Sequence, residues 1–331
     1  VDNNTQLILL GDKNQLASVE AGSLFGDLCK LKNTVNHFTE ERFQFINSLL
    51  ASDEKKIPKS ITHESLGLLA NHVIELKKSY RFHAQSAIGH FSRAVIENDS
   101  TKLQHFLHAN TDPSVVVDLK NTSDLFDSLV LSYVDFIQEP DISKALKKLN
   151  SFRVLCAVRK GEQGIYAINE RIEKYLADKK IKNHDGTLFA PYGDSYVNRP
   201  VIVTQNNKEQ NLFNGDIGIM RYDQHKRMHV WFEDQEQGVR SVIPSQITAM
   251  ETVFAMTIHK SQGSEFPSVL VILPEQIENK LLTRELVYTA ITRAKEKVVL
   301  VCNESVLLQA CSIQIQRISG INQRIETELS L

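Results

Sequence analysis

The stretch from residue 253 to residue 273 restricts the possible fold more than any other part of this sequence. Residues 253–256 (VFAM) are typical of the end of a buried strand, and residues 269–273 (VLVIL) are typical of a second one. Between them, residues 257–266 read T-I-H-K-S-Q-G-S-E-F. This segment is too polar for a core. Taken alone, it is consistent with either a capped helix start or a ligand-binding loop.

Strand-like and helix-like segments alternate along most of the chain. Short apolar runs predict buried strands at residues 5–10, 115–117, 152–158 and 298–302. Apolar residues three or four positions apart predict helices at residues 38–50, 84–97, 125–137, 167–176 and 284–294. This alternation predicts a parallel sheet with helices on both faces. Because a domain seldom opens on a central strand such as 5–10, we expect the chain to be part of a longer polypeptide.

The pattern changes between residues 197 and 249. Short strands at residues 200–204, 212–220, 229–232 and 239–243 are separated by turn residues. The pair Asn214-Gly215 is typical of a tight turn. We therefore predict a small all-β insert, a barrel of about 50 residues, inside the α/β domain.

Composition excludes several classes of protein. The 331 residues suffice for two domains, and a net charge of −2 restricts any nucleic-acid surface to a local groove. The four cysteines form no C-x-x-C pair, which favours buried thiols in a reducing cytoplasm over disulfides or a zinc site. No apolar run is long enough to cross a membrane. The pair Asp53-Glu54 follows no strand and indicates a solvated loop, so we predict no metal site within the chain.

Polar clusters stand at the predicted strand ends and helix starts, and their order resembles that of the later motifs of superfamily 1 helicases. The chain most resembles the RecD family, the alpha subunits of the RecBCD exonuclease V complex, in GDKNQLASVEAG, KKSYRF, FNGDIGI, TIHKSQGSEF and LTRELVYTAITRAK. The resemblance covers nearly the whole chain. It implies a RecA-like (P-loop NTPase type) parallel-sheet motor domain, at residues 65–196 and 250–331. It further implies a remnant of the first RecA-like domain at residues 1–64 and an SH3-like β-barrel inserted at residues 197–249.

Outside residues 257–266, the resemblance assigns four residues to nucleotide chemistry. It implies that Gln15 couples the nucleotide to DNA, that Tyr80 stacks on adenine, and that Arg81 reaches the γ-phosphate. Arg293 matches an arginine finger, a cation that stabilises charge on the transferred phosphoryl group. Without the resemblance, Gln15 is equally a loop-capping residue and Tyr80 a tyrosine at the edge of a core.

The same resemblance divides residues 257–266 between two ligands. It implies that Thr257 and His259 contact the DNA backbone, although His259 alone could equally be a packed, hydrogen-bonded histidine. It implies that Gly263 offers its N–H to a phosphate and that Glu265 accepts from the ribose hydroxyls.

Further DNA contacts are implied outside this loop. The resemblance places Arg159 on the DNA, and it places Phe213, Asn214 and Gly215 of the insert beside a groove for single-stranded DNA.

The chain contains no G-x-x-x-x-G-K-[ST] loop and no strand-borne Asp-Glu pair. We therefore expect the main ligands of ATP and Mg²⁺ to precede Val1, and we do not expect the chain to hydrolyse ATP alone. The resemblance implies a cytoplasmic 5′ to 3′ DNA helicase subunit that works with RecB and RecC in double-strand break repair by homologous recombination. Two alternatives remain open: a standalone RecD-like or Pif1-like helicase, and a non-catalytic module that binds single-stranded DNA or docks another subunit.

Overall fold

The computed structural model of the chain describes residues 2, 5–16, 24–29, 35–52, 56–59, 69, 71–76, 86–120, 123–275, 282–315, 324 and 327. The chain divides into two compact units. One consists of Val1–Tyr80 with Ile315–Leu331, and the other is Arg81–Gln314. The second, larger unit contains both sheets of the described structure.

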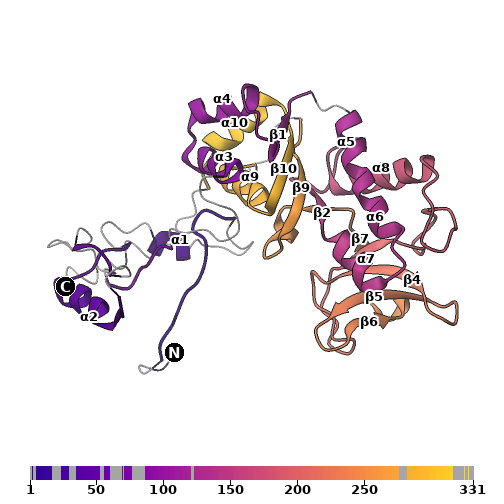
Figure 1. Cartoon of the computed structure of the whole chain (residues 1–331), viewed down its shortest axis with the longest axis horizontal. Helices are drawn as coiled ribbons and strands as arrows, with labels where there is room; N and C mark the ends of the chain where they lie inside the picture. The colour runs from indigo at the N-terminus through magenta and orange to yellow at the C-terminus, as the bar shows by residue number, and fades with distance from the viewer. Residues whose placement is uncertain are drawn as a thin grey trace. The chain divides into compact units, whose positions relative to one another are not determined.

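The larger unit is built on a parallel five-stranded sheet in the order β1-β10-β9-β2-β8 (Figure 1). Its strands are β1 (Val115–Asp118), β2 (Phe152–Cys156), β8 (Ala255–Thr257), β9 (Phe266–Ile272) and β10 (Ala294–Val301). Every neighbouring pair is parallel. Continuous apolar runs suit such strands because both of their faces are buried. The predicted parallel sheet is confirmed, with β8 at one edge.

Helices cover both faces of this sheet. In β9, Leu270 and Ile272 join a core cluster formed with helices α5 to α8, whereas Val269 and Val271 alternate with them and are equally buried. The helices are α3 (Ala87–Glu97), α4 (Ser100–His108), α5 (Ser123–Val130), η3 (Leu131–Tyr133), α6 (Val134–Ile137), α7 (Ile142–Leu149), α8 (Ile165–Asp178), α9 (Arg284–Ile291) and α10 (Glu304–Ser312). Figure 1 shows α3, α4, α9 and α10 on one side of the sheet and α5, α6 and α8 on the other.

Helices α4, α7 and α10 were not predicted from the sequence. The first two had local signals, because Asp99 and Asp141 cap them by accepting hydrogen bonds from Lys102 N and Lys144 N. The predicted helices at residues 84–97 and 167–176 are confirmed as α3 and α8.

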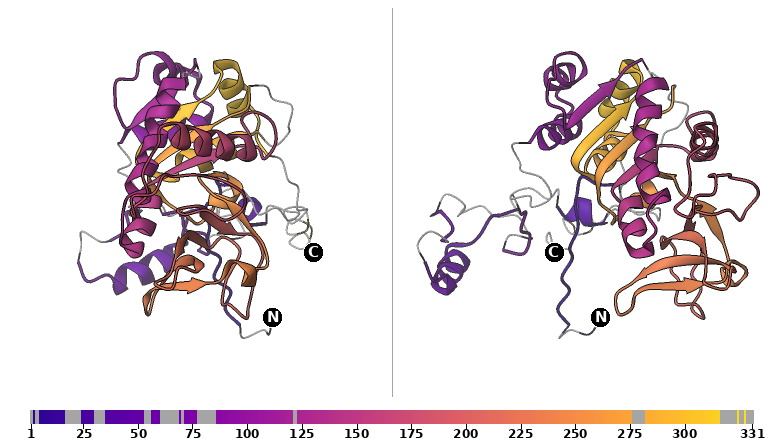
Figure 2. Two further views of the ribbon diagram at one scale, coloured as in Figure 1. Left: turned by 90° about the vertical axis from the view of Figure 1, so that its right-hand side faces the viewer. Right: turned by 45° about the vertical axis from the view of Figure 1, so that its right-hand side comes forward.

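A second, antiparallel sheet interrupts the α/β unit in sequence between α8 and β8. Its order is β6-β5-β4-β3-β7, with β3 (Pro200–Val203), β4 (Ile217–Tyr222), β5 (Met228–Asp234), β6 (Gly238–Val242) and β7 (Met250–Thr252). Val201, Met220, Val230 and Phe232 are among the residues of its own small core. The predicted all-β insert is thus present as an antiparallel sheet. Figure 2 shows it beside the α/β part, where β5 and β6 contact α7.

A buried arginine ties the antiparallel sheet to the helices. Arg221 of β4 is 1% exposed, and its Nη2 donates to Phe136 O of α6 at 2.9 Å while its Nε donates to Asn198 Oδ1 at 2.7 Å. Burial lowers the pKa of Arg221 to about 10, so the side chain remains charged near neutral pH. The two parts of this unit are therefore held together by polar contacts as well as by apolar packing.

The predicted strand at residues 5–10, in the smaller unit, was wrong. Residues 5–10 form no strand, and Leu7, Ile8 and Leu10 are 72, 78 and 91% exposed. Extended backbone becomes a buried strand only when neighbouring strands take up its N–H and C=O groups, and these residues pair with no strand in the described part of the chain.

The described helices of the smaller unit are α1 (Leu24–Leu28) and α2 (Glu40–Leu49). The predicted helix at residues 38–50 is confirmed as α2, whose N-cap Thr39 accepts a hydrogen bond from Arg42 N at 3.2 Å. A bridge between Val35 and Val73 joins two further segments of this unit.

Candidate functional site

The two ends of the polar loop 257–266 lie at opposite ends of the strands of the parallel sheet. The carboxyl edge is the border of the sheet at which its strands end, and the amino edge is the border at which they begin. Thr257 closes β8 and is level with Ile272, the last residue of β9, because both pair with Cys156 of β2. Phe266 opens β9 and pairs with Ala294, the first residue of β10. Residues 258–265 therefore run from the carboxyl edge of the sheet back to its amino edge. The polar side chains of the loop are divided between two separate places.

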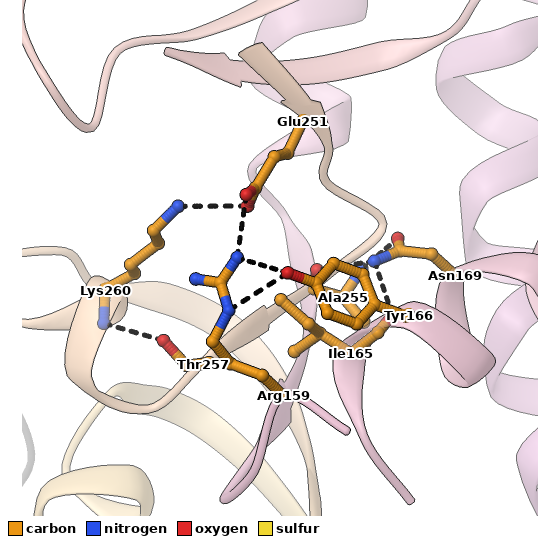
Figure 3. A network of polar contacts seen from close by, with 8 residues as sticks. All are labelled: Arg159, Ile165, Tyr166, Asn169, Glu251, Ala255, Thr257 and Lys260. Carbon is orange, nitrogen blue, oxygen red and sulfur yellow. Dashed lines mark hydrogen bonds and ion pairs between the residues drawn. The ribbon is translucent and has the colours of Figure 1, made fainter. Parts of the chain in front are cut away.

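At the carboxyl edge, the loop meets Arg159 and the antiparallel sheet (Figure 3). Arg159 Nη2 lies 2.7 Å from Glu251 Oε1, and Lys260 Nζ lies 3.2 Å from Glu251 Oε2. Lys260 N donates to Thr257 Oγ1 at 3.2 Å. Residues from β7, from the loop after β2 and from the loop after β8 thus meet at the edge where α/β sheets bind ligands.

Neighbouring groups stabilise the charged forms of Arg159 and Glu251 at this edge. Arg159 donates to the Tyr166 hydroxyl at 2.6 Å, and its guanidinium carbon lies 5.3 Å from the Tyr166 ring centroid. The hydrogen bond to Tyr166 and the pairing with Glu251 raise the pKa of Arg159. Burial favours the neutral form of Glu251, but hydrogen bonds and charge from Lys260 and Arg159 outweigh it and lower the pKa of this carboxyl group. Arg159 and Glu251 are therefore both ionised near neutral pH.

Asn169 fixes the edge strand that ends at Thr257. Its Oδ1 accepts from Ala255 N at 2.9 Å, and its Nδ2 donates to Ala255 O at 3.0 Å and to Ile165 O at 2.8 Å. The side-chain amide thus pairs with the open side of β8 as a neighbouring strand would. Asn169 was not singled out from the sequence, where it is one polar residue on a helix.

At the amino edge, the loop is joined to the end of α9. Arg293 is 1% exposed, its Nη1 donates to Ser264 O at 3.0 Å, and its Nε donates to Thr289 O at 3.1 Å. Glu265 pairs with Lys295 at 3.0 Å. Gly263 has φ +84° and nothing within 4 Å of the place where a Cβ would stand, so its backbone is approachable. Gly263 and Glu265 thus flank Ser264, the loop residue that Arg293 holds.

A groove of about 730 Å³ lies against this amino edge. Residues 264–266 form one part of its lining, and Phe213, Gly215 and residues of β5 form another. Its ionisable lining residues are five carboxylates and one guanidinium, from Asp216, Glu233, Asp234, Glu236, Glu265 and Arg240. Backbone N–H groups of Gln237 and Glu236 lower the pKa of Asp234, which keeps it charged. The groove is acidic and disfavours a phosphate.

The predicted turn of the insert borders this groove. Gly215 has φ +105°, a conformation that suits glycine, and its N–H donates to Val203 O at 2.9 Å. Phe213 is 53% exposed, and Asn214 N donates to Asn206 Oδ1 at 2.8 Å. The turn therefore presents an aromatic ring to solvent on a backbone held by hydrogen bonds.

Of the other predicted residues, one lies in the smaller unit, two lie outside the described residues, and one lies within the loop itself. Gln15 is in the smaller unit, where its Nε2 donates to Asp12 Oδ2 at 2.9 Å. Tyr80 and Arg81 lie outside the described residues. His259 opens the short helix η5 (His259–Ser261) and is half-buried. The assigned roles of these residues stay predictions.

Glu251, Lys260 and Lys295 were not identified as functional residues from the sequence. Glu251 is an isolated carboxylate in a short strand, 92 positions from its partner Arg159, and no local pattern marks it. Lys260 lies inside the polar loop, so its position was the available signal. Lys295 lies two residues after Arg293, and although half-exposed it pairs with Glu265.

All four cysteines lie in described segments; Cys156, Cys302 and Cys311 are buried thiols, as predicted, whereas Cys29 is half-buried. Burial raises the pKa of Cys302 and of Cys311 to about 12, which keeps both protonated. Among the described residues, no group of three or more His, Cys, Asp or Glu side chains could hold a metal ion. None of the described helices is long and apolar enough to span a membrane.

The family of UvrD-like helicase C-terminal domains matches residues 252–301, which include β8, the polar loop, β9, α9 and β10. The chain therefore contains a helicase-like α/β fold with a parallel sheet. Its relatives narrow the class further. It is 30% identical to the RecBCD enzyme subunit RecD of Haemophilus influenzae, over 97% of this chain and 50% of that protein. It is 31% identical to the RecD subunit of Mycolicibacterium smegmatis, over 97% of this chain and 49% of that protein.

The chain is thus RecD-like over nearly its whole length, and it spans about half the length of these relatives. The ATP-dependent RecD2 DNA helicase of Deinococcus radiodurans is 29% identical over 44% of this chain and 19% of that protein. A crystal structure of Bacteroides Pif1 helicase with ADP-AlF3 and ssDNA covers 78% of this chain and 57% of its own, at 15% identity and a TM-score of 0.37. A likeness this low supports no conclusion about fold or function.

Proposed function

We propose that this chain is the C-terminal portion of an ATP-dependent 5′ to 3′ DNA helicase, the alpha subunit of a RecBCD-type exonuclease V. The similarity to RecD subunits over 97% of the chain supports the class. The observation that favours a strand-binding role is the meeting of Arg159 and Lys260 at the carboxyl edge of the sheet. By this proposal the subunit works in the cytoplasm with RecB and RecC, in double-strand break repair by homologous recombination.

The proposed domain division follows the predicted one. Residues 65–196 and 250–331 would form the second RecA-like domain, residues 197–249 an SH3-like insert, and residues 1–64 a remnant of the first RecA-like domain with a connecting segment. The antiparallel sheet between α8 and β8 supports the insert, and the parallel sheet supports the RecA-like domain.

The proposed DNA ligand is a single strand held by two kinds of contact. Arg159, Thr257 and His259 would contact the sugar-phosphate backbone at the carboxyl edge, where Arg159 is 42% exposed. Phe213, with Asn214 and Gly215, would offer a surface on which a base stacks, because the adjacent groove is acidic and unsuited to phosphate.

The proposed nucleotide contacts lie at the amino edge of the sheet. By this proposal Gly263, which has open space beside its backbone, would offer its N–H to a phosphate, and Arg293, hydrogen-bonded to the neighbouring Ser264, would be the arginine finger. Glu265 is close by in sequence and would accept from ribose hydroxyls. ATP with Mg²⁺ supplies the phosphoryl group whose hydrolysis drives a helicase. Gln15, Tyr80 and Arg81 complete the proposed set, and the main phosphate and metal ligands would come from elsewhere in the parent protein.

Strand binding is tested with a fluorescein-labelled oligothymidylate and this chain, titrated at several salt concentrations. We expect binding that weakens with salt. Arg159→Ala should lower the slope of log K against log salt by about 0.7, the value for one phosphate contact on a single strand. Lys102→Ala is the matched control, because Lys102 is an exposed cation on α4, beside β1 at the far side of the sheet from β8.

The alternative function is a non-catalytic module that docks another subunit. Absence of salt-dependent strand binding by the folded chain would favour this alternative and would contradict the DNA proposal. An unchanged slope in Arg159→Ala would remove Arg159 from the strand path. We also expect negligible ATPase activity from this chain alone, and steady DNA-stimulated phosphate release would contradict that.

A further inference from the structure

One carboxylate is shared between two cations at the carboxyl edge (Figure 3). Glu251 Oε1 meets Arg159 Nη2 at 2.7 Å, and Glu251 Oε2 meets Lys260 Nζ at 3.2 Å. Each oxygen thus takes one cation. The two non-bridging oxygens of a phosphodiester can be shared between two cations in the same way.

The charges in this triad do not balance. Glu251 supplies one negative charge against the two cations Arg159 and Lys260, and its neighbours lower the pKa of Glu251 and raise the pKa of Arg159. The side chains are also accessible, at 33% for Glu251, 42% for Arg159 and 23% for Lys260. A solvent-facing pair of cations with one excess charge favours an anionic ligand.

The two cations have supports that do not depend on Glu251. Arg159 is held by the Tyr166 hydroxyl at 2.6 Å, and the backbone of Lys260 is held by Thr257 Oγ1 at 3.2 Å. The ion pairs are exposed enough to be individually weak, so that an incoming anion can displace the carboxylate at small cost. Movement of Glu251 would leave Arg159 and the Lys260 backbone near their present positions.

We propose that Arg159 and Lys260 form a two-cation subsite for one phosphodiester of the strand, and that Glu251 is its internal competitor. Strand binding exchanges the Glu251 carboxylate for a phosphate. This inference rests on the proposed single-strand function. Because Glu251 belongs to β7 and the two cations belong to loops of the parallel sheet, the exchange also releases an ionic link between the two sheets.

The test is Glu251→Gln in this chain, measured with the labelled oligothymidylate at fixed salt. Glutamine keeps the shape of the side chain and removes its charge, so we expect binding about three- to tenfold tighter than in the wild-type chain, because weak ion pairs no longer compete. The matched control is Glu304→Gln. Glu304 is an exposed carboxylate on α10 that accepts a hydrogen bond from Gln104 Nε2 at 2.9 Å; α10 packs against α4 and α9, and neutralising Glu304 makes the same change in net charge. This control should change affinity less than twofold.

The specific signature is coupling between the carboxylate and the cations. In an Arg159→Ala, Lys260→Ala background, Glu251→Gln should gain no more affinity than Glu304→Gln does. A full gain in that background would show a general charge effect and would overturn the subsite. Thermal melting of each variant, with an unchanged midpoint, verifies that the fold is retained.

Two further outcomes separate this inference from the function on which it rests. If the wild-type chain does not bind the oligothymidylate, the proposed strand function fails. If it binds and Glu251→Gln binds equally or more weakly, only the competitor role fails. A nucleoside triphosphate, titrated at matched ionic strength, shows whether the subsite binds the phosphate of a free nucleotide or that of a strand. A gain seen for the nucleotide and not for the oligothymidylate would overturn the assignment to a strand.

Discussion

The two ends of the loop 257–266 differ in charge, in exposure and in how they are held. At the carboxyl edge, Arg159 and Lys260 are accessible cations that share one carboxylate. At the amino edge, Arg293 is buried against backbone carbonyls, and residues 264–266 line a groove rich in carboxylates. One short loop therefore contributes to two surfaces of different charge and exposure. Neighbouring polar residues of one motif thus lie in two different environments.

The largest expected effect on stability is at the amino edge, where Arg293 is buried. Arg293→Ala should lower the free energy of unfolding by about 2 to 4 kcal/mol, because the carbonyls of Ser264 and Thr289 lose buried hydrogen bonds and a cavity remains. Urea unfolding measures the change. A loss below about 0.5 kcal/mol would show that Arg293 is not the anchor of the amino edge.

In a longer protein, the same substitution of Arg293 tests whether this residue also acts in ATP hydrolysis. In a polypeptide with the complete nucleotide site, Arg293→Ala should abolish most ATP turnover while nucleotide binding is retained, as expected for a group that stabilises transition-state charge. A near-normal kcat would refute the arginine-finger role. Retained turnover with lost stability would leave Arg293 a purely structural residue.

A smaller effect is expected where Asn169 supports β8. Asn169→Ala should cost about 1 to 3 kcal/mol, since Ala255 N–H and C=O lose their buried partners. Because β8 positions Thr257, strand binding should weaken as well. Hydrogen exchange at the Ala255 amide reports the local opening. Asn169→Asp is the matched variant, since it keeps the acceptor for Ala255 N–H and removes the donor to Ala255 O.

The two edges should also differ in how strand binding depends on salt. Phe213→Ala is expected to weaken oligothymidylate binding about fivefold through lost stacking, without changing the salt slope. Arg159→Ala is expected to change the slope. If Phe213→Ala lowered the slope as well, the acidic groove would have to contain a phosphate contact, and the contrast between the edges would be lost. Unchanged affinity would remove Phe213 from the strand path.

The smallest expected effect is at the Glu265–Lys295 ion pair. The side chains are 32 and 47% exposed, so solvent screens their attraction. Lys295→Ala should change the free energy of unfolding by less than about 0.5 kcal/mol. A larger loss by urea unfolding would show that this pair, and not only Arg293, holds the loop at the amino edge.

Local sequence determined most of the elements in the larger unit. Continuous apolar runs such as 269–273 specify strands buried on both faces, and the pair Asn214-Gly215 specifies a turn because Gly215 adopts a positive φ. The motif at residues 257–266 also marked the region that matches a helicase family. These features depend on the chemistry of adjacent residues, and a single sequence contains that information.

Only the tertiary structure decided which residues meet. Residues 5–10 have the composition of a buried strand, but a strand also needs neighbours, and here Leu10 is 91% exposed. Glu251 meets Arg159 and Lys260 because β7, β2 and β8 converge at one edge, which no local pattern encodes. The parallel register sends Thr257 and Phe266 to opposite edges of the sheet. Sequence thus determined the elements and the motif, whereas the packing of distant strands determined how the motif divides into two sites.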